Sequence, residues 1–374
     1  MNLLEAWLRE DDSGAAYFRA IQPAIPANLV SAVNYARILE VASRVPGVCA
    51  LGGFYFEFFL GEEEARADIS FRAAADQGCP EALAAWEPAG RGVWDGSWPA
   101  LKRLAGRWKQ PGGLLQEEIE AIWLEFDING TRPYSPSFFL TPAPPRRSWA
   151  GNFQGCKSLL EFLSGELNGA ISPTGIAAAL SCLERLPGKA RLGQIGFMLS
   201  RRPAVLRLCL EMEGKEIPKY LRSLGEFADL RQVAEILEML SPYDHEFILH
   251  LDLLEELQPK VGLDLMLSSA DSFPDPRLEI ILNELCHLKL CTPAKGEALQ
   301  NISGCTPMGA DLINWPPGLR RRSLQSGLDE LSYFIRSISH LKMVIEPGKD
   351  PVAKGYVGVN HYWKKNSVPA INPQ

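Results

Sequence analysis

Five pairs of segments in which apolar and polar residues alternate constrain the fold of this chain more than any other feature. The pairs lie at residues 49–73, 121–141, 191–211, 246–267 and 339–359. Alternation with a period of two is typical of β-strands that bury one face. Within each pair, a short polar or Pro/Gly link joins the two runs, for example at residues 61–64 and 347–351. Such links are typical of hairpins, so the sequence predicts five antiparallel β-hairpins.

The segments between the hairpins carry signals for helix starts. Ser172, Asp275 and Thr292 each precede a proline, which places a capping side chain before a residue suited to the first helical turn. Asp229 and Gln232 resemble a capping box at the start of another helix. We expect further helices at residues 29–41, 98–108, 158–163, 218–224 and 323–338, a proline-rich connector at 142–147 and a long irregular loop at 304–321.

Hairpins and helices together form a weak internal repeat with a period of about 70 residues. An open sheet of so many strands would curl and leave its edges exposed, whereas a closed barrel has no edges. We therefore predict an α+β fold in which a ten-stranded antiparallel barrel is covered by helices on the outside. The barrel would form a single domain over residues 1–374, with a flexible tail at 366–374. Two α+β domains that divide near residues 142–147 are the alternative.

The composition excludes several classes of protein. Of the 374 residues, 46% are hydrophobic and the formal net charge is −7, which excludes a disordered chain and disfavours a nucleic-acid partner. No apolar run is long enough to span a bilayer and the first residues lack a basic export signal, so we expect a cytoplasmic protein without a membrane partner. The eight cysteines include no CxxC pair, so we expect neither disulfides nor a structural metal. Glycine-rich phosphate loops and the GxSxG and HExxH motifs are absent.

If helices cover the outside, the polar strand faces line the barrel. The residues predicted to face inward are Tyr55, Glu57, Arg66, Asp68, Ser70, Arg72, Trp123, Glu125, Asp127, Arg207, Cys209, Glu211, His250, Asp252, Lys260, Gly262, Asp264, Met266, His340, Lys342, Glu346, Lys354 and Tyr356. Buried charges are costly, so such an interior must be wet, internally paired or filled by a charged ligand. Several converging Lys and Arg side chains could hold a diphosphate. The alternative is an ordinary antiparallel sheet whose polar face meets solvent.

Among the inward residues other than carboxylates, His250 is the best candidate for acid–base chemistry. It lies two positions before Asp252 on the same predicted strand. Imidazole titrates near neutral pH, which suits proton transfer. A structural histidine with satisfied hydrogen bonds is the alternative.

The C-terminal hairpin resembles the closing hairpin of a known enzyme family. Residues 340–349 precede a strand in which Lys354-Gly-Tyr356 leads into the pair His361-Tyr362. This pattern resembles the indole prenyltransferases of the dimethylallyltryptophan-synthase type. Residues 204–211 resemble the family strand that carries Lys-x-Tyr, with Arg207 in place of the diphosphate-binding Lys and Cys209 in place of a shielding Tyr. The resemblance implies the PT-barrel (ABBA) fold, which has five αββα repeats around a ten-stranded barrel.

The resemblance also implies a function and a set of site residues. The expected enzyme is a prenyltransferase that moves a dimethylallyl or longer prenyl group from its diphosphate to an aromatic, indole-like or peptide acceptor in natural-product biosynthesis. Glu57 would match the family glutamate that accepts the indole N–H proton. The expected diphosphate-binding residues are Arg66, Arg72, Arg207, Lys260, Lys342, Lys354 and Tyr356, and the expected acceptor-binding residues are Tyr55, Trp123, Glu125, Asp127, Glu211, Asp252 and Asp264. No DDxxD motif is present, so the sequence does not suggest an obligate Mg²⁺ cluster, and prenyl diphosphate would be a co-substrate without a further cofactor.

The inward residues include more carboxylates than a diphosphate site needs. They could bind a cationic acceptor, for example arginine or a basic peptide. A tailoring enzyme that transfers no prenyl group, or a barrel that only binds such a ligand, therefore remains an alternative.

Overall fold

The computed structural model describes residues 13–87, 97–128, 135–143, 153–167, 169–201, 203–225, 229–267, 275–309, 314–326 and 329–365. The tail predicted at residues 366–374 and part of the predicted connector at 142–147 lie outside these residues. That the whole chain forms a single domain stays a prediction.

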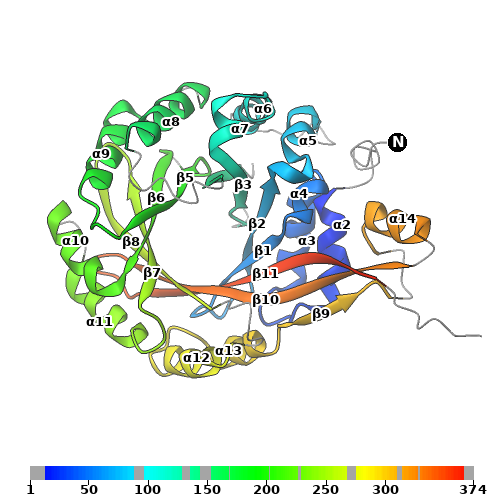
Figure 1. The fold of residues 1–374 in the computed structure, drawn as a ribbon. Coiled ribbons are helices and arrows are strands. Elements are labelled where there is room, and N and C mark those ends of the chain that lie inside the picture. Colours follow the sequence, from blue (N-terminus) through cyan, green and yellow to red (C-terminus); the bar gives the residue numbers. More distant parts are fainter. Residues whose placement is uncertain are drawn as a thin grey trace, which may run out of the picture.

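All five predicted hairpins are present, and their strands form one closed antiparallel barrel (Figure 1). The strands are β1 (Phe54–Phe59), β2 (Ala67–Ala74), β3 (Ile119–Phe126), β4 (Ser137–Pro142), β5 (Arg191–Met198), β6 (Val205–Glu213), β7 (Glu246–Leu253), β8 (Leu257–Met266), β10 (Glu330–Ile345) and β11 (Val352–Lys365). Strands β1 to β8 pair in chain order, β8 pairs with β10, β10 with β11, and β11 with β1. The sheet continues from β4 to β5 where the two-domain alternative would divide it.

Helices form a ring outside the barrel, which Figure 1 shows in a view close to the barrel axis. They are α2 (Gly14–Ile21), α3 (Ala32–Ala42), α4 (Val48–Leu51), α5 (Cys79–Ala85), α6 (Ser97–Trp108), α7 (Leu114–Glu118), α8 (Phe153–Glu166), α9 (Pro173–Glu184), α10 (Ile217–Leu224), α11 (Leu230–Leu240), α12 (Arg277–His287) and α13 (Pro293–Gln300). Helix α14 (Pro317–Gln325) lies outside this ring, beside the extended end of β10. The predicted N-caps Ser172, Asp229 and Thr292 each accept a hydrogen bond from the third residue after them. These caps satisfy backbone donors that a helix start leaves without partners.

The hydrophobic core lies between the helices and the outer strand faces. Phe18 of α2 packs against Phe54, Phe56 and Phe71, with ring centroids 4.5, 5.2 and 5.6 Å away. On β6, the residues on the two sides of Arg207 are fully buried in this core, whereas Arg207 itself lines the interior. Because strand side chains alternate between two faces, burial of one face in the helix layer leaves the other facing the lumen.

Two predictions in the C-terminal part are wrong. The helix predicted at residues 323–338 ends at Gln325, and β10 begins at Glu330. In β10 the residues Ser332, Phe334 and Ile338 are buried while their neighbours are partly exposed, which is the period of a strand. The loop predicted at residues 304–321 contains β9 (Gly304–Pro307), which pairs with β10 beyond the barrel, and the first turn of α14.

Close packing of α9 on the turn between β7 and β8 gives a first testable prediction. A Cβ at Gly175 would lie 2.1 Å from the backbone oxygen of Leu254, so Gly175→Ala forces α9 away from the barrel. We expect Gly175→Ala to lower the free energy of unfolding by about 1–3 kcal/mol, measured by urea denaturation. Gly106→Ala in α6 is the control, since a Cβ there meets nothing within 4 Å and alanine favours a helix. Equal stability of the two variants would contradict this packing.

Candidate active site in the barrel lumen

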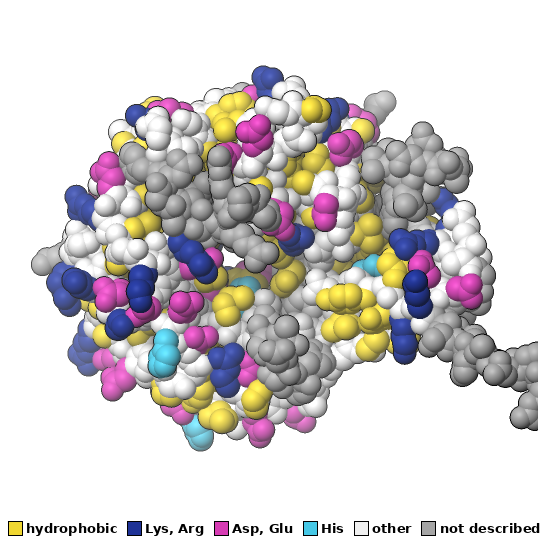
Figure 2. Space-filling model, in the orientation of Figure 1, with side chains coloured by type: hydrophobic (Ala, Val, Ile, Leu, Met, Phe, Trp, Pro, Cys, Tyr) yellow, Lys and Arg dark blue, Asp and Glu magenta, His cyan; other side chains and the backbone are white. Residues whose placement is uncertain are grey.

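The barrel encloses a cavity of about 340 Å³, called the lumen cavity below. Figure 2, in the orientation of Figure 1, shows a hollow at the centre of the molecule with charged side chains of both signs near its rim. The predicted site residues in its wall are Tyr55, Trp123, Glu125, Arg207, Glu211, Asp264, Lys342 and Tyr356. The wall also contains Phe139, Thr141 and Gln194, which the sequence did not single out. The size is that of a site for a small molecule.

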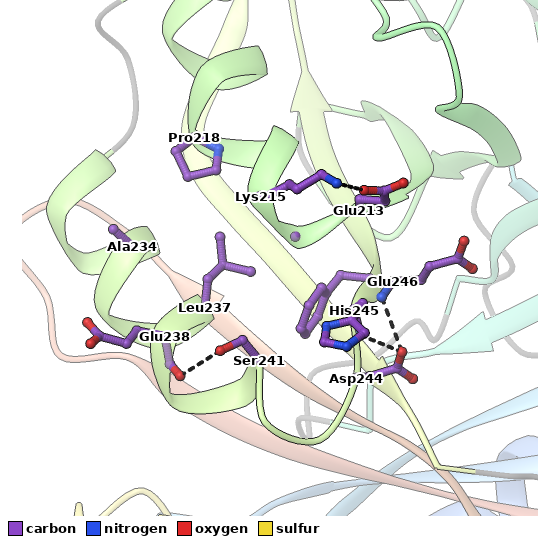
Figure 3. Close-up of a pocket in the computed structure, with 12 residues that line it drawn as sticks. Glu213, Lys215, Pro218, Ala234, Leu237, Glu238, Ser241, Asp244, His245 and Glu246 are labelled. Carbon is purple, nitrogen blue, oxygen red and sulfur yellow. Dashed lines mark hydrogen bonds and ion pairs between the residues drawn. The ribbon is translucent and has the colours of Figure 1, made fainter.

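A larger hollow of about 690 Å³ lies outside the barrel, between α10, α11 and the start of β7 (Figure 3). Its floor contains Leu237 and Phe247. Three of its charged groups already have partners: Lys215 pairs with Glu213 at 2.5 Å, and Asp244 accepts hydrogen bonds from backbone N–H groups. None of the predicted site residues lines this hollow. The lumen cavity is therefore the better candidate site.

Glu57 of β1 is held by two residues of β11. Lys354 and the hydroxyl of Tyr356 each donate a hydrogen bond to one of its carboxylate oxygens. Burial opposes the ionisation of Glu57, but Lys354 and these hydrogen bonds outweigh it and lower its pKa to about 2. The ring of Tyr356 also stacks on His340, with centroids 4.0 Å apart. Glu57 is therefore a fixed anion that orients Lys354 and Tyr356.

Glu125 of β3 differs from Glu57 although both lie on inward strand faces. Glu125 has no hydrogen bond or ion pair with the residues that the structure describes. Burial raises its pKa to about 7, and the negative charges of Glu57 and Asp127 act in the same direction. A carboxylate with a pKa near 7 can take up or release a proton at neutral pH.

Two further carboxylates lie near Glu57 and Glu125. Asp68 accepts a hydrogen bond of 2.6 Å from the backbone N–H of Ile128, and Asp127 accepts one of 2.8 Å from the hydroxyl of Ser200. Burial raises the pKa of Asp68, and the charges of Glu57 and Asp127 add to this. This side of the lumen therefore carries an excess of carboxyl groups.

Four basic side chains, from β6, β8, β11 and the turn before β6, lie near one another. Arg207 donates two hydrogen bonds to Asp252, at 2.6 and 2.9 Å, and Arg201 donates one to the same carboxylate at 2.7 Å. Lys260 has no hydrogen bond or ion pair with the described residues. Burial lowers its pKa, and the charges of Arg201, Lys354 and Arg207 lower it further. We call Arg201, Arg207, Lys260 and Lys354 the cation cluster.

Arg201 could not be identified from strand alternation because it lies in the turn between β5 and β6. Its hydrogen bond to Asp252 brings it beside Arg207. A basic residue in a hairpin turn is usually solvated, so the sequence carried no signal for this role.

Next to Arg207 in the sheet, His250 of β7 joins the two strands that flank it. Its Nε2 lies 2.6 Å from Asp264 of β8, and its Nδ1 lies 3.4 Å from the sulfur of Cys209 on β6. The partner carboxylate is thus Asp264 and not Asp252, which the sequence placed nearest to His250. Lys342 of β10 lies 3.4 Å from the other oxygen of Asp264.

Three predicted residues form ion pairs near the ends of the strands. Arg66 donates two hydrogen bonds of 2.8 Å to Glu62, and its guanidinium lies 3.7 Å from the centre of the Phe59 ring. Arg72 pairs with Glu120, and Glu211 pairs with Arg191. Of these, only Glu211 borders the lumen cavity.

Among the described residues, no group of histidine, cysteine and carboxylate side chains could hold a metal ion. Within the same residues, no helix is long and apolar enough to cross a membrane.

No protein-family model matches the chain, and no curated protein matches it significantly. Solved structures do match. The 6-dimethylallyltryptophan synthase from Micromonospora olivasterospora, solved with DMASPP and Trp, superposes with a TM-score of 0.52 over 92% of this chain and 96% of that chain, at 11% sequence identity. The prenyltransferase PriB gives 0.48 over 92% and 94% at 12% identity, and the 5-dimethylallyltryptophan synthase from Streptomyces coelicolor gives 0.46 over 92% and 95% at 12% identity.

The closed barrel with its outer helices is a PT barrel, the ABBA fold. The resemblance to the dimethylallyltryptophan-synthase type, predicted from the C-terminal hairpin, is confirmed at the level of the fold. At this sequence identity the similarity establishes the fold alone, and the chemistry has to be argued from the lumen.

Proposed function

We propose that this protein transfers a prenyl group from an allylic diphosphate to an acceptor bound in the lumen cavity. The observation that carries the proposal is the cation cluster, in which Lys260 has neighbours of its own charge and no described ion-pair partner. Asp252 and Glu57 pair with the other three cations, so the partly buried Lys260 is the one that a bound anion would stabilise most. A diphosphate supplies such an anion, with several oxygens that can accept hydrogen bonds at once.

The other members of the cluster keep donors for this anion. Arg207 uses two N–H groups for Asp252, and a guanidinium has five. Lys354 donates to Glu57 and has further N–H groups to offer. As the allylic C–O bond breaks, negative charge grows on the diphosphate, and fixed cations stabilise it in the transition state. Arg66 and Arg72 keep their pairs with carboxylates and are not part of this proposal.

Aromatic side chains would stabilise the prenyl cation that remains. Tyr55 and Trp123 pack edge to face with centroids 4.9 Å apart, and Phe139 and Tyr356 also line the lumen cavity. The faces of such rings attract a cation, and the rings exclude water that would quench it.

The acceptor would occupy the lumen cavity beside Glu125. The new bond forms between the prenyl carbon and the acceptor, and the acceptor's proton passes to Glu125, whose pKa suits a base at neutral pH. The role that the sequence predicted for Glu57 as this base stays a prediction. An indole-like or peptide acceptor, a role in cytoplasmic natural-product biosynthesis, and prenyl diphosphate as the only co-substrate belong to the same proposal.

Thermal-shift titration with dimethylallyl diphosphate, geranyl diphosphate and inorganic pyrophosphate tests the donor site. A ligand at about 100 times its Kd stabilises the folded state by about 2.7 kcal/mol, which is an easily measured rise in melting temperature. Lys260→Gln should weaken binding of the diphosphates about 10- to 100-fold, since a hydrogen bond to a charged group is worth about 1.5–3 kcal/mol.

Lys189→Gln is the matched control, because Lys189 is 91% exposed outside the barrel. The same ligand affinity in Lys260→Gln and Lys189→Gln would contradict a diphosphate at the cation cluster. A well-folded wild-type protein that shows no shift at millimolar diphosphate would exclude the transferase. A shift with a guanidinium compound or a basic peptide alone would instead favour the binding-barrel alternative.

A further inference from the structure

We infer that Cys209, His250 and Asp264 form a nucleophilic thiol site that accepts the acyl group of a small ester or thioester bound in the lumen cavity. This activity goes beyond the proposed prenyl transfer and does not rest on it. The three side chains come from the adjacent strands β6, β7 and β8 and all line the lumen cavity.

The geometry is that of a nucleophile, a base and a group that orients the base. The Cys209 sulfur lies 3.4 Å from Nδ1 of His250, and Nε2 of His250 lies 2.6 Å from Asp264. Strand pairing fixes these positions, since Cys209 is the direct partner of His250. Side chains held on paired strands keep their geometry better than side chains on loops.

The pKa values of Asp264 and His250 indicate which atoms of this site carry protons at neutral pH. Burial opposes ionisation of Asp264, but His250 and Lys342 outweigh it and lower its pKa, so this carboxylate only accepts hydrogen bonds. Burial lowers the pKa of His250 to about 4, so its imidazole is neutral at pH 7 and has one N–H. That N–H lies on Nε2 and donates to Asp264. Nδ1 therefore carries a lone pair that faces the thiol of Cys209.

Cys209 rests as a thiol and loses its proton only during the reaction. Burial raises its pKa to about 12, while Lys342 and Arg207 favour the thiolate. The proton then moves to Nδ1 of His250 as sulfur attacks, which is how a neutral nucleophile is activated by an adjacent base. Among the described cysteines, only Cys209 has a histidine as hydrogen-bond partner.

Transfer of the acyl group to Cys209 needs no co-reactant besides these side chains and water. The sulfur of Cys209 bonds to the acyl carbon, the bond to the ester oxygen or thioester sulfur breaks, and His250 passes the thiol proton to the leaving group. His250 then takes a proton from water, whose oxygen bonds to the acyl carbon. The C–S bond breaks, the carboxylic acid leaves, and His250 gives that proton to the sulfur of Cys209. Lys342 lies beside this pair, with its Cε 2.9 Å from where a Cβ of Gly262 would be, and supplies positive charge for the oxyanion. The absence of a side chain at Gly262 leaves room for Lys342 next to His250.

The test uses the full chain with Cys305→Ser as background, because Cys305 is exposed and would consume reagent. The probes are p-nitrophenyl acetate and the acetyl thioester of N-acetylcysteamine, and the readouts are intact mass and peptide mapping. We expect one acetyl group, on Cys209, formed faster than on Cys286, which is more exposed but has no histidine partner.

His250→Gln keeps an N–H for Asp264 but removes the base. We expect it to slow acetylation of Cys209 about 100-fold or more, with an unchanged melting temperature. Lys189→Gln, at an exposed position outside the barrel, should leave the acetylation rate unchanged. Acetylation of Cys286 before Cys209 would overturn the inference, and this comparison needs no substitution in the site. An unchanged acetylation rate of Cys209 in folded His250→Gln would overturn it as well.

Discussion

Glu125→Gln is expected to lower kcat for prenyl transfer about 100- to 10,000-fold, because it removes the base that takes the acceptor's proton. Glutamine has nearly the same shape and cannot accept the proton. Diphosphate binding should be unchanged, since Glu125 is not part of the cation cluster. Single-turnover assays with a prenylated indole or peptide product as readout measure this loss.

The pH dependence gives a sharper form of this prediction. The groups whose charges act on Glu125 are Glu57, Asp127, Arg207 and Lys342. Because a base works in its ionised form, wild-type activity should rise with pH through about 7, and this limb should vanish in Glu125→Gln.

Stability tests the same pKa without an acceptor. A carboxyl group with a raised folded-state pKa stabilises the protein fully below its unfolded pKa of about 4.3, and this contribution is lost as pH rises to about 7. Wild-type protein should therefore lose stability relative to Glu125→Gln between these pH values. If the difference in free energy of unfolding between the two proteins does not change with pH, Glu125 is ionised over this whole pH range.

Glu57→Gln is the matched comparison. It removes the anion that orients Lys354 and Tyr356, so we expect weaker diphosphate binding together with a smaller fall in kcat. If Glu57→Gln abolishes the rise of activity near pH 7 and Glu125→Gln keeps it, Glu57 is the base, as the sequence predicted.

Asp252→Asn is expected to lower the free energy of unfolding by about 3–5 kcal/mol, the usual cost of leaving a buried charge without its partner. Arg207 is 7% exposed and Asp252 is 5% exposed, so water cannot replace the lost carboxylate charge. Arg201 shares the same carboxylate and would lose its partner too. Urea denaturation of both proteins measures the difference.

The loss of stability in Asp252→Asn should also depend on pH. Burial opposes ionisation of Asp252, but Arg207 and Arg201 outweigh it and lower its pKa. A depressed pKa contributes stability above the unfolded value of about 3.9, and this stability is lost as pH falls below it. The gap between wild type and Asp252→Asn should therefore close at acidic pH. Glu235→Gln, which breaks an exposed pair with Arg231, is the control and should cost less than about 1 kcal/mol.

Eight of the predicted site residues line the lumen cavity, but their partners could not be assigned from the sequence. Glu57 and Glu125 have the same pattern of neighbours along their strands, yet only Glu57 meets Lys354 and Tyr356. His250 and Asp252 share a face of one strand, whereas the hydrogen bond of His250 crosses to Asp264 on the next strand. Partners across strands depend on register, which is set by the turns and by packing of the outer faces.

The sequence by itself determined the five hairpins and the inward face of most of their strands, because side chains alternate along a strand and one face was apolar enough for the helix layer. The alternation of a strand is also present in the sequence of β10, although residues 323–338 were predicted as a helix. Only the tertiary structure decided that the strands close into one barrel in this register. Closure brings residues from distant hairpins together in a low-dielectric interior. That proximity makes Lys354 a partner of Glu57, leaves Glu125 without a partner among the residues that the structure describes, and brings Arg201, Arg207 and Lys260 close together.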